Sequence, residues 1–262
     1  MIIEREVARI HSKLAWEKQM SGHSKWATTK HKKAIIDAKR SKIFTKVAKL
    51  LTIAVRDGKS GDPNSNPTLR MAIENARAVS MPKDNIDRAI KRGIGGEDGG
   101  LRIEEVNYEA YAPGGIALLI ECLTDNKNRA LAEVKANLNK AGGSMASAGS
   151  VSYLFRKVGQ IIIDSSKSGK SSEELEEVII ESGASDFSNQ DGTFLITTEI
   201  KDLNSVADYF KTIGIDIESA EIVQVPNSTI EISDNQEESL LKLLDNLDEL
   251  DDVNNVYTNA NI

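Results

Sequence analysis

Lysine and arginine side chains that could bind phosphate are concentrated near the start of this chain. Between residues 21 and 93, seventeen Lys and Arg stand against six Asp and Glu, a net charge of +11, although the whole chain carries −7. Residues 94–262 therefore hold about −19. Because clustered cations attract a polyanion, this asymmetry predicts a nucleic-acid-binding segment joined to acidic domains.

The densest cluster is a basic arm, residues 21–40, which leads into a predicted helix. Candidate nucleic-acid contacts in the arm and the helix are His23, Ser24, Lys25, Trp26, Lys30, His31, Lys32, Lys33, Lys39, Arg40, Lys42, Lys46 and Lys49. The last three are four and three residues apart, so a helix would align them; they are called the lysine row below. Trp26 could either stack on a base or pack the arm onto the helices.

No residue pattern indicates catalysis, a metal or a cofactor. His23 and His31 lack a nearby carboxylate pair or cysteine, and the surrounding cations would repel a metal ion. Ser24 has no orienting acid, and the glycine-rich stretch 95–100 lacks the strand and the Gly-Lys-Ser/Thr of a phosphate loop. The single cysteine, Cys122, excludes an internal disulfide and fits a reducing cytoplasm. We expect a non-enzymatic protein with no catalytic residues, metal, cofactor or small-molecule substrate.

The sequence leaves open the roles of two other sets of polar residues. The acids near the C-terminus lack the glycine-punctuated spacing of a calcium loop. They are Asp245, Asp248, Glu249, Asp251 and Asp252. They could form a solvated face, repel nucleic acid toward the basic segment, or cover that segment when no partner is bound. Arg129, near Asn126 and Asn128, could be a second contact point, or a surface charge beside a helix cap.

The basic segment should fold as three short helices. Apolar residues recur with a 3.6-residue period from 41 to 57, and Gly58 is the expected left-handed stop. Asn66-Pro67 should begin a second helix, and Pro82 a third that stops at Gly93. These helices would bury small apolar residues and leave their cations outside.

After the stretch 95–100 the pattern changes to alternating strands and helices. A hairpin of strands 106–112 and 116–123 precedes a helix from Asp125-Asn126 to Gly142-Gly143. A strand at 150–155 should follow. The next elements have the βαββαβ order of a ferredoxin-like unit. They are strands 159–164, 185–190, 193–198 and 215–225, with helices 172–182 and 202–213. A strand (228–232), a helix (235–249) and a strand (252–258) end the chain.

The predicted fold class is α+β multidomain: an N-terminal three-helix bundle plus two α+β domains. The ferredoxin-like domain is inserted in the other if the last elements return to the sheet begun at 106. The expected divisions are an N-terminal extension (1–20), the basic bundle with its arm (21–94), a discontinuous middle domain (101–156 and 227–262) and the inserted domain (157–226). No run of about 18 apolar residues predicts a membrane span.

Four long stretches resemble the YebC/PmpR family, which also contains a mitochondrial translational activator of cytochrome c oxidase. They are residues 21–46, 62–93, 108–134 and 240–262, within a similarity that covers about 20–262. The resemblance implies three domains, the third ferredoxin-like and inserted into the second, and no enzymatic activity. Its GHSKW stretch corresponds to Gly22, His23, Ser24, Lys25 and Trp26. Residues 1–19 depart from the family pattern.

The resemblance leaves two leading hypotheses about the partner. Some members are named as transcriptional regulators that bind promoter DNA, and others act in translation with the ribosome and its RNA. An enzyme and a module that binds an acidic protein are weaker alternatives. We predict a DNA-binding regulator, with a ribosome- or RNA-associated translation factor as the alternative. The expected location is the bacterial cytoplasm, or the mitochondrial matrix if the source is eukaryotic. The oligomeric state stays open.

Overall fold

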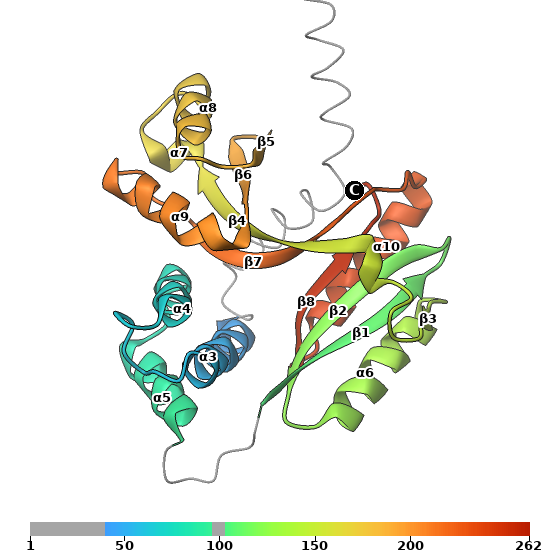
Figure 1. The fold of residues 1–262 in the computed structure, drawn as a ribbon. Helices are drawn as coiled ribbons and strands as arrows, with labels where there is room; N and C mark the ends of the chain where they lie inside the picture. The colour runs from blue at the N-terminus through green and yellow to red at the C-terminus, as the bar shows by residue number, and fades with distance from the viewer. Residues whose placement is uncertain (1–39, 96–102) are drawn as a thin grey trace, which may run out of the picture.

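The computed structural model describes residues 40–95 and 103–262, which fold into a helical bundle and two sheets with helices (Figure 1). The arm up to Lys39 and the segment 96–102 lie outside the described residues. The bundle comprises α3 (Arg40–Asp57), α4 (Pro67–Ala78) and α5 (Lys83–Ile94). Its core contains Leu51, Val55, Leu69 and Ala76, each nearly or fully excluded from solvent.

Asn66 joins two helices of the bundle. Its Oδ1 accepts a hydrogen bond of 3.0 Å from the N–H of Leu69, which caps α4, and Pro67 follows at the first helical position. Its Nδ2 donates to the carbonyl oxygens of Ala54 and Ser60, at the end of α3 and in the following turn. The cap predicted from Asn66-Pro67 is therefore present, and it also fixes where α3 ends.

Two glycines have roles other than the predicted helix stops. Lys59, not Gly58, takes the positive φ after α3, and a side chain at Gly58 would collide with Asn66. Gly93 lies inside α5, and a Cβ there would be 2.7 Å from the carbonyl oxygen of Thr52 on α3. Gly93 thus permits close packing of α3 and α5, while Gly95, with φ of 91°, caps the helix.

The middle sheet combines strands from both ends of the described region. Its order is β3-β1-β2-β8. The strands are β1 (Glu104–Ala112), β2 (Ile116–Thr124), β3 (Ser144–Met145) and β8 (Val253–Thr258). Helices α6 (Lys127–Lys140) and α10 (Asp234–Asp248) contribute Val134, Leu138 and Leu244 to the apolar core that they share with β1, β2 and β8. β8 is antiparallel to β2, so the C-terminal strand completes a sheet that begins about 150 residues earlier at Glu104.

The second sheet has the ferredoxin-like strand order β5-β6-β4-β7, with all neighbours antiparallel. Its strands are β4 (Phe155–Asp164), β5 (Asp186–Gln190), β6 (Thr193–Thr198) and β7 (Ser219–Pro226). Its helices are α8 (Ser172–Glu181), α9 (Leu203–Thr212) and the short α7 (Ser165–Ser168), with the 3-10 turn Ile200–Asp202. Because β8 returns to the first sheet, this domain is inserted in the middle domain. The predicted fold class is confirmed, while the exact domain boundaries stay predictions.

Two predicted strands are wrong and one was not predicted. The stretch 150–155 forms the 3-10 turn Ser152–Leu154, and β4 starts only at Phe155. The stretch 228–232 makes a single bridge, Ile230 to Ala260. The two-residue β3 is too short to leave a sequence pattern.

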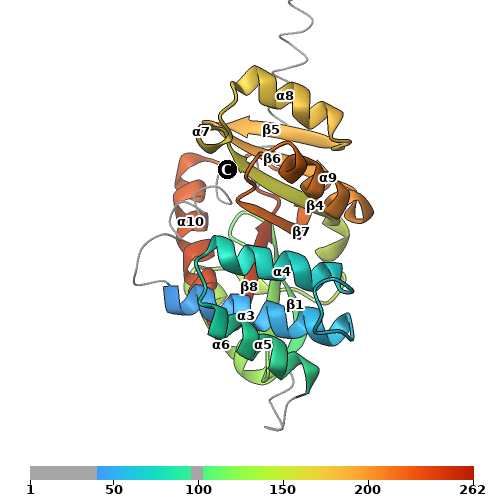
Figure 2. The same ribbon diagram turned by 90° about the vertical axis from the view of Figure 1, so that its left-hand side faces the viewer.

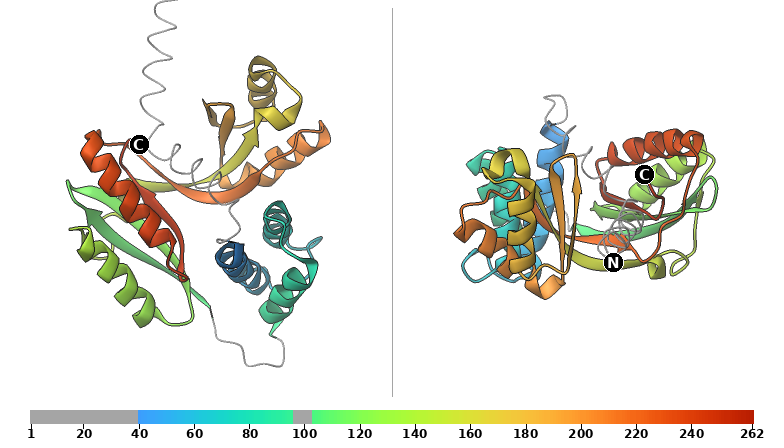
Figure 3. Two further views of the ribbon diagram at one scale, coloured as in Figure 1. Left: turned by 180° about the vertical axis from the view of Figure 1, so that it is seen from behind. Right: turned by 90° about the horizontal axis from the view of Figure 1, so that it is seen from above.

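The bundle lies beside both α+β domains in two perpendicular views (Figures 1 and 2), and its side chains contact each of them. Asn75 of α4 exchanges hydrogen bonds with the backbone of Ala220 in β7, and Met71 packs against the core of the inserted domain. On its other side α3 lies against the middle domain, near the end of α10 (Figure 3). This second contact includes the lysine row.

Candidate nucleic-acid interface

All three lysines of the lysine row contact one acidic segment. This segment, residues 248–252, spans the end of α10 and the turn before β8 and is called the acidic turn below. Lys42 Nζ lies 2.7 Å from Glu249 Oε2 and 2.8 Å from the Glu249 carbonyl oxygen. Lys46 Nζ lies 2.9 Å from Asp248 Oδ1 and 2.8 Å from the Asp248 carbonyl oxygen. Each ammonium therefore binds both a carboxylate and the carbonyl end of a helix, where the dipole is negative.

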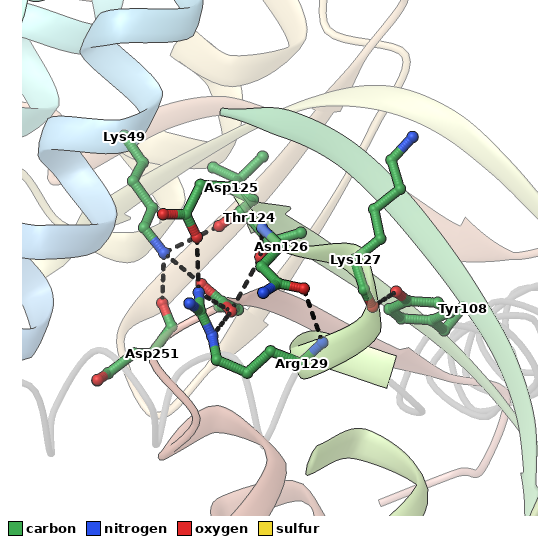
Figure 4. A network of polar contacts seen from close by, with 10 residues as sticks. Lys49, Tyr108, Thr124, Asp125, Asn126, Lys127, Arg129 and Asp251 are labelled. Atoms are coloured by element: carbon green, nitrogen blue, oxygen red, sulfur yellow. Dashed lines mark hydrogen bonds and ion pairs between the residues drawn. The ribbon is translucent and has the colours of Figure 1, made fainter. Parts of the chain in front are cut away.

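Lys49 makes the most buried of these contacts (Figure 4). Its Nζ lies 2.9 Å from Asp252 Oδ1, 2.8 Å from the Asp251 carbonyl oxygen and 2.9 Å from the Leu123 carbonyl oxygen. The side chains of Lys49 and Asp252 are 17% and 4% exposed. Lys49 thus links α3 to both β2 and the acidic turn.

Asp252 is the centre of this network. Its Oδ2 also accepts hydrogen bonds from the Thr124 hydroxyl at 2.9 Å and from Arg129 Nη2 at 2.6 Å. Burial favours the neutral carboxyl group, but the bonds from Lys49, Arg129 and Thr124 outweigh it and hold the pKa of Asp252 below its usual value. Asp252 is therefore a buried, charged anchor between the bundle and the middle domain.

Arg129 and Asn126 serve this same anchor. Asn126 caps α6 by accepting a bond from the N–H of Arg129, and Arg129 also pairs with Asp125 at 2.8 Å. The bonds to Asp252 and Asp125 raise the pKa of the guanidinium, which stays charged. Of the two interpretations of this stretch, helix capping is what the geometry shows for Asn126. The Arg129 side chain is still 45% exposed.

A cleft of about 1000 Å³ lies between the bundle and the middle domain. Arg88 and Arg92 of α5 line one wall, and Arg129 and the acidic turn line the other. Phe44 of α3 is among its apolar residues. Arginine, lysine and acidic side chains all line the cleft, so its charge is mixed.

Five other cations, on α4 and α5, are exposed. They are Arg77, Lys83, Arg88, Lys91 and Arg92. Among residues 40–95 and 103–262 none of the five forms a salt bridge, although Arg88 bonds to the Asp84 carbonyl and the Asn85 side chain. Their charges contribute to the net charge of the basic segment, but the sequence does not single them out as contacts, because only the fold shows which cations are left exposed.

Most of the predicted contact residues precede α3 in the sequence. His23, Ser24, Lys25, Trp26, Lys30, His31, Lys32, Lys33 and Lys39 lie outside the described residues. Arg40 is the first residue of α3. Among the predicted contact residues that the structure describes, the lysine row comes together, and it does so against acids of the same chain. Asp252 was named only as one acid of a cluster, because its partners lie far away in sequence.

The described residues offer no other obvious chemistry. In the part of the chain that the structure describes, no group of three His, Cys, Asp or Glu could hold a metal ion, and no helix could span a membrane. Cys122 is buried in β2, and burial raises the pKa of its thiol to about 12, so the unreactive thiol form dominates at neutral pH.

A basic three-helix bundle, held by an acidic α+β domain that carries a ferredoxin-like insertion, defines a three-domain class of protein. Two family models match this chain: the TACO1/YebC N-terminal domain at residues 24–96, and the TACO1/YebC second and third domain at 103–260. The chain belongs to the TACO1/YebC family.

Relatives and one solved structure agree with this assignment. A Bifidobacterium longum protein named "Probable transcriptional regulatory protein" is 50% identical over 240 residues, 92% of this chain and 94% of its own. A Thermobifida fusca protein of the same name is 47% identical over 243 residues, with coverage of 93% and 96%. A crystal structure of a conserved hypothetical protein from Aquifex aeolicus has a TM-score of 0.81 and 41% identity, covering 87% of this chain and 92% of that one.

Proposed function

We propose that this protein is a non-enzymatic regulator of gene expression that binds DNA through the basic arm and the bundle. The observation that carries the proposal is the charge separation, with +11 on residues 21–93 and about −19 on residues 94–262. The exposed cations of α4 and α5 add further phosphate-binding groups to those of the basic arm. The names of the bacterial relatives support a regulatory role.

The mechanism is phosphate neutralisation by lysine and arginine. No recognition helix with base-reading Asn, Gln or Arg stands out among the described helices, so the surface is expected to contribute affinity more than base readout. If about six phosphates are contacted, the logarithm of the affinity should fall with the logarithm of salt concentration with a slope of roughly −5 for duplex DNA. The predicted cytoplasmic location stays a prediction.

The test is duplex binding over a series of salt concentrations. Lys32→Glu with Lys33→Glu should weaken binding to every sequence and flatten the salt slope, because the arm then contacts fewer phosphates. The matched control is Lys135→Glu with Lys140→Glu, an equal charge change at exposed positions of α6. If the arm and control variants have the same affinity and slope, the arm is not the binding surface.

Crosslinking in cells distinguishes DNA from RNA as the physiological partner. Ultraviolet crosslinks to a few recurrent promoter sequences, lost in the arm variant, would support the proposal. Crosslinks concentrated at one place in ribosomal RNA would replace it with a role in translation. Trp26→Ala supplies a second comparison, because a stacking ring contributes more to single-stranded RNA than to duplex binding.

A further inference from the structure

We propose that the acidic turn is an intramolecular competitor of nucleic acid: it occupies the lysine row in place of phosphate and is displaced when nucleic acid binds. The proposal rests on the proposed function, since it concerns how the same basic surface is regulated. It follows from what the three lysines contact, how far each is buried and where the row begins.

The acidic turn supplies the kind of groups that a nucleic-acid backbone would supply. Glu249, Asp248 and Asp252 each present a carboxylate oxygen within 2.7–2.9 Å of one lysine of the row. Backbone carbonyl oxygens at the end of α10 add further acceptors at 2.8 Å. A row of anionic oxygens following one face of α3 is also what a phosphodiester backbone offers.

Burial means that phosphate cannot simply be added to these contacts. The side chains of Lys46 and Lys49 are only 15% and 17% exposed, because the middle domain covers them. Their ammonium groups already have at least two oxygen partners each. Nucleic acid can therefore use Lys46 and Lys49 only if the acidic turn leaves them.

The contacts weaken toward the N-terminal end of α3, which follows the arm in the sequence. The Lys42 side chain is 42% exposed and that of its partner Glu249 is 43% exposed, so solvent screens this pair most. Asp248 is more covered, and Asp252 is buried. Nucleic acid held by the arm arrives at Lys42, so displacement should begin with Glu249, continue with Asp248 and meet its strongest resistance at Asp252.

The test removes the two outer carboxylates and keeps the buried one. Asp248→Asn with Glu249→Gln leaves the backbone carbonyl contacts of Lys42 and Lys46 and the Asp252 anchor in place, so the fold should be retained. The matched control is Glu176→Gln with Glu177→Gln on α8 of the inserted domain, which changes the net charge equally. Both proteins and the unmodified protein are titrated with one 30-base-pair DNA duplex over a salt series.

We expect the Asp248/Glu249 variant to bind about tenfold more tightly than the control variant, because Lys42 and Lys46 no longer have to leave two carboxylates before they bind phosphate. A variant that matches the control in affinity at every salt concentration would overturn the competitor proposal. If no form of the protein binds the duplex, the proposed function fails and this proposal fails with it. Binding that depends on Lys32 and Lys33 but not on Asp248 and Glu249 overturns the competitor proposal alone.

Labelling of lysine amines gives a second, structural readout. An amine-reactive acetylating reagent should modify Lys42 and Lys46 faster in the Asp248/Glu249 variant than in the unmodified protein, while exposed Lys91 reacts equally in both. Added duplex should then protect Lys42 and Lys46 of the variant. If duplex leaves those two lysines as reactive as before, phosphate does not take the place of the carboxylates.

Discussion

Replacing Asp252 by Asn should weaken the attachment of the bundle to the middle domain. The amide keeps the size of the side chain but removes its charge and turns one acceptor into a donor. That donor would face groups that now donate to Asp252, namely Lys49, Arg129 and Thr124. The substitution therefore leaves buried donors without their acceptor, which is the costly way to break a buried ion pair.

The expected loss in the free energy of unfolding is about 3 kcal/mol. Removing one member of a buried pair typically costs about 3–5 kcal/mol. The low end applies because Lys49 keeps the carbonyl oxygens of Leu123 and Asp251. The matched control is Asp251→Asn, whose side chain is exposed and whose carbonyl bond to Lys49 is unaffected; it should change stability by less than about 0.5 kcal/mol.

Urea unfolding as a function of pH measures this effect. The folded state lowers the pKa of Asp252 from its ordinary 3.8, so its stabilisation is fully present above that value and is lost as pH falls through the lower folded value. The difference between the unmodified protein and Asp252→Asn should thus be constant near neutral pH and shrink below about pH 4. Two results would refute the anchor role: a loss in the free energy of unfolding below about 1 kcal/mol at pH 7, or a difference between the two proteins that stays the same at low pH.

Two further substitutions test the packing of the bundle. Asn66→Ala should lower the free energy of unfolding by about 2–3 kcal/mol, because the cap of α4 and the bonds to Ala54 and Ser60 are lost together. Exposed Asn64→Ala is the control. Equal urea midpoints for the two variants would contradict the argument. Gly93→Ala should cost about 1–3 kcal/mol despite better helix propensity, because the added methyl group meets the Thr52 carbonyl. Its control is Lys91→Ala on the exposed face of α5, and a stabilised Gly93→Ala would show that the helices do not pack so closely.

The sequence predicted those parts of the fold whose signals are local. Asn66-Pro67 predicts a capped helix, and alternating apolar patterns with Gly and Pro turns predict the hairpin and the βαββαβ unit. Predictions were wrong where a glycine or a short apolar run is compatible with more than one local structure. Gly93 marks close helix packing instead of a helix end, and residues 228–232 lack the partner strand that their composition would suit.

The candidate site was only partly predictable from the sequence, because its two halves lie far apart in the chain. The spacing of Lys42, Lys46 and Lys49 predicts a shared helix face, and the helix places them there. Their acidic partners are about 200 residues away, so no local pattern pairs them. The sequence leaves three roles open for the C-terminal acids, one of which is to cover the basic segment. Only the tertiary structure shows that Asp248, Glu249 and Asp252 lie against the lysine row.

The late position of the acidic turn in the chain also matters during synthesis. α3 ends at Asp57 and the acidic turn begins at Asp248, so about 190 residues are translated between them. At about 5–20 residues per second, the newly made lysine row has no acidic turn to bind for about 10–40 seconds. β8, which completes the middle sheet, is also made last. During synthesis, the positive charges of the lysine row therefore have no carboxylates of the acidic turn beside them. These charges are paired only after the end of the chain has been made and folded.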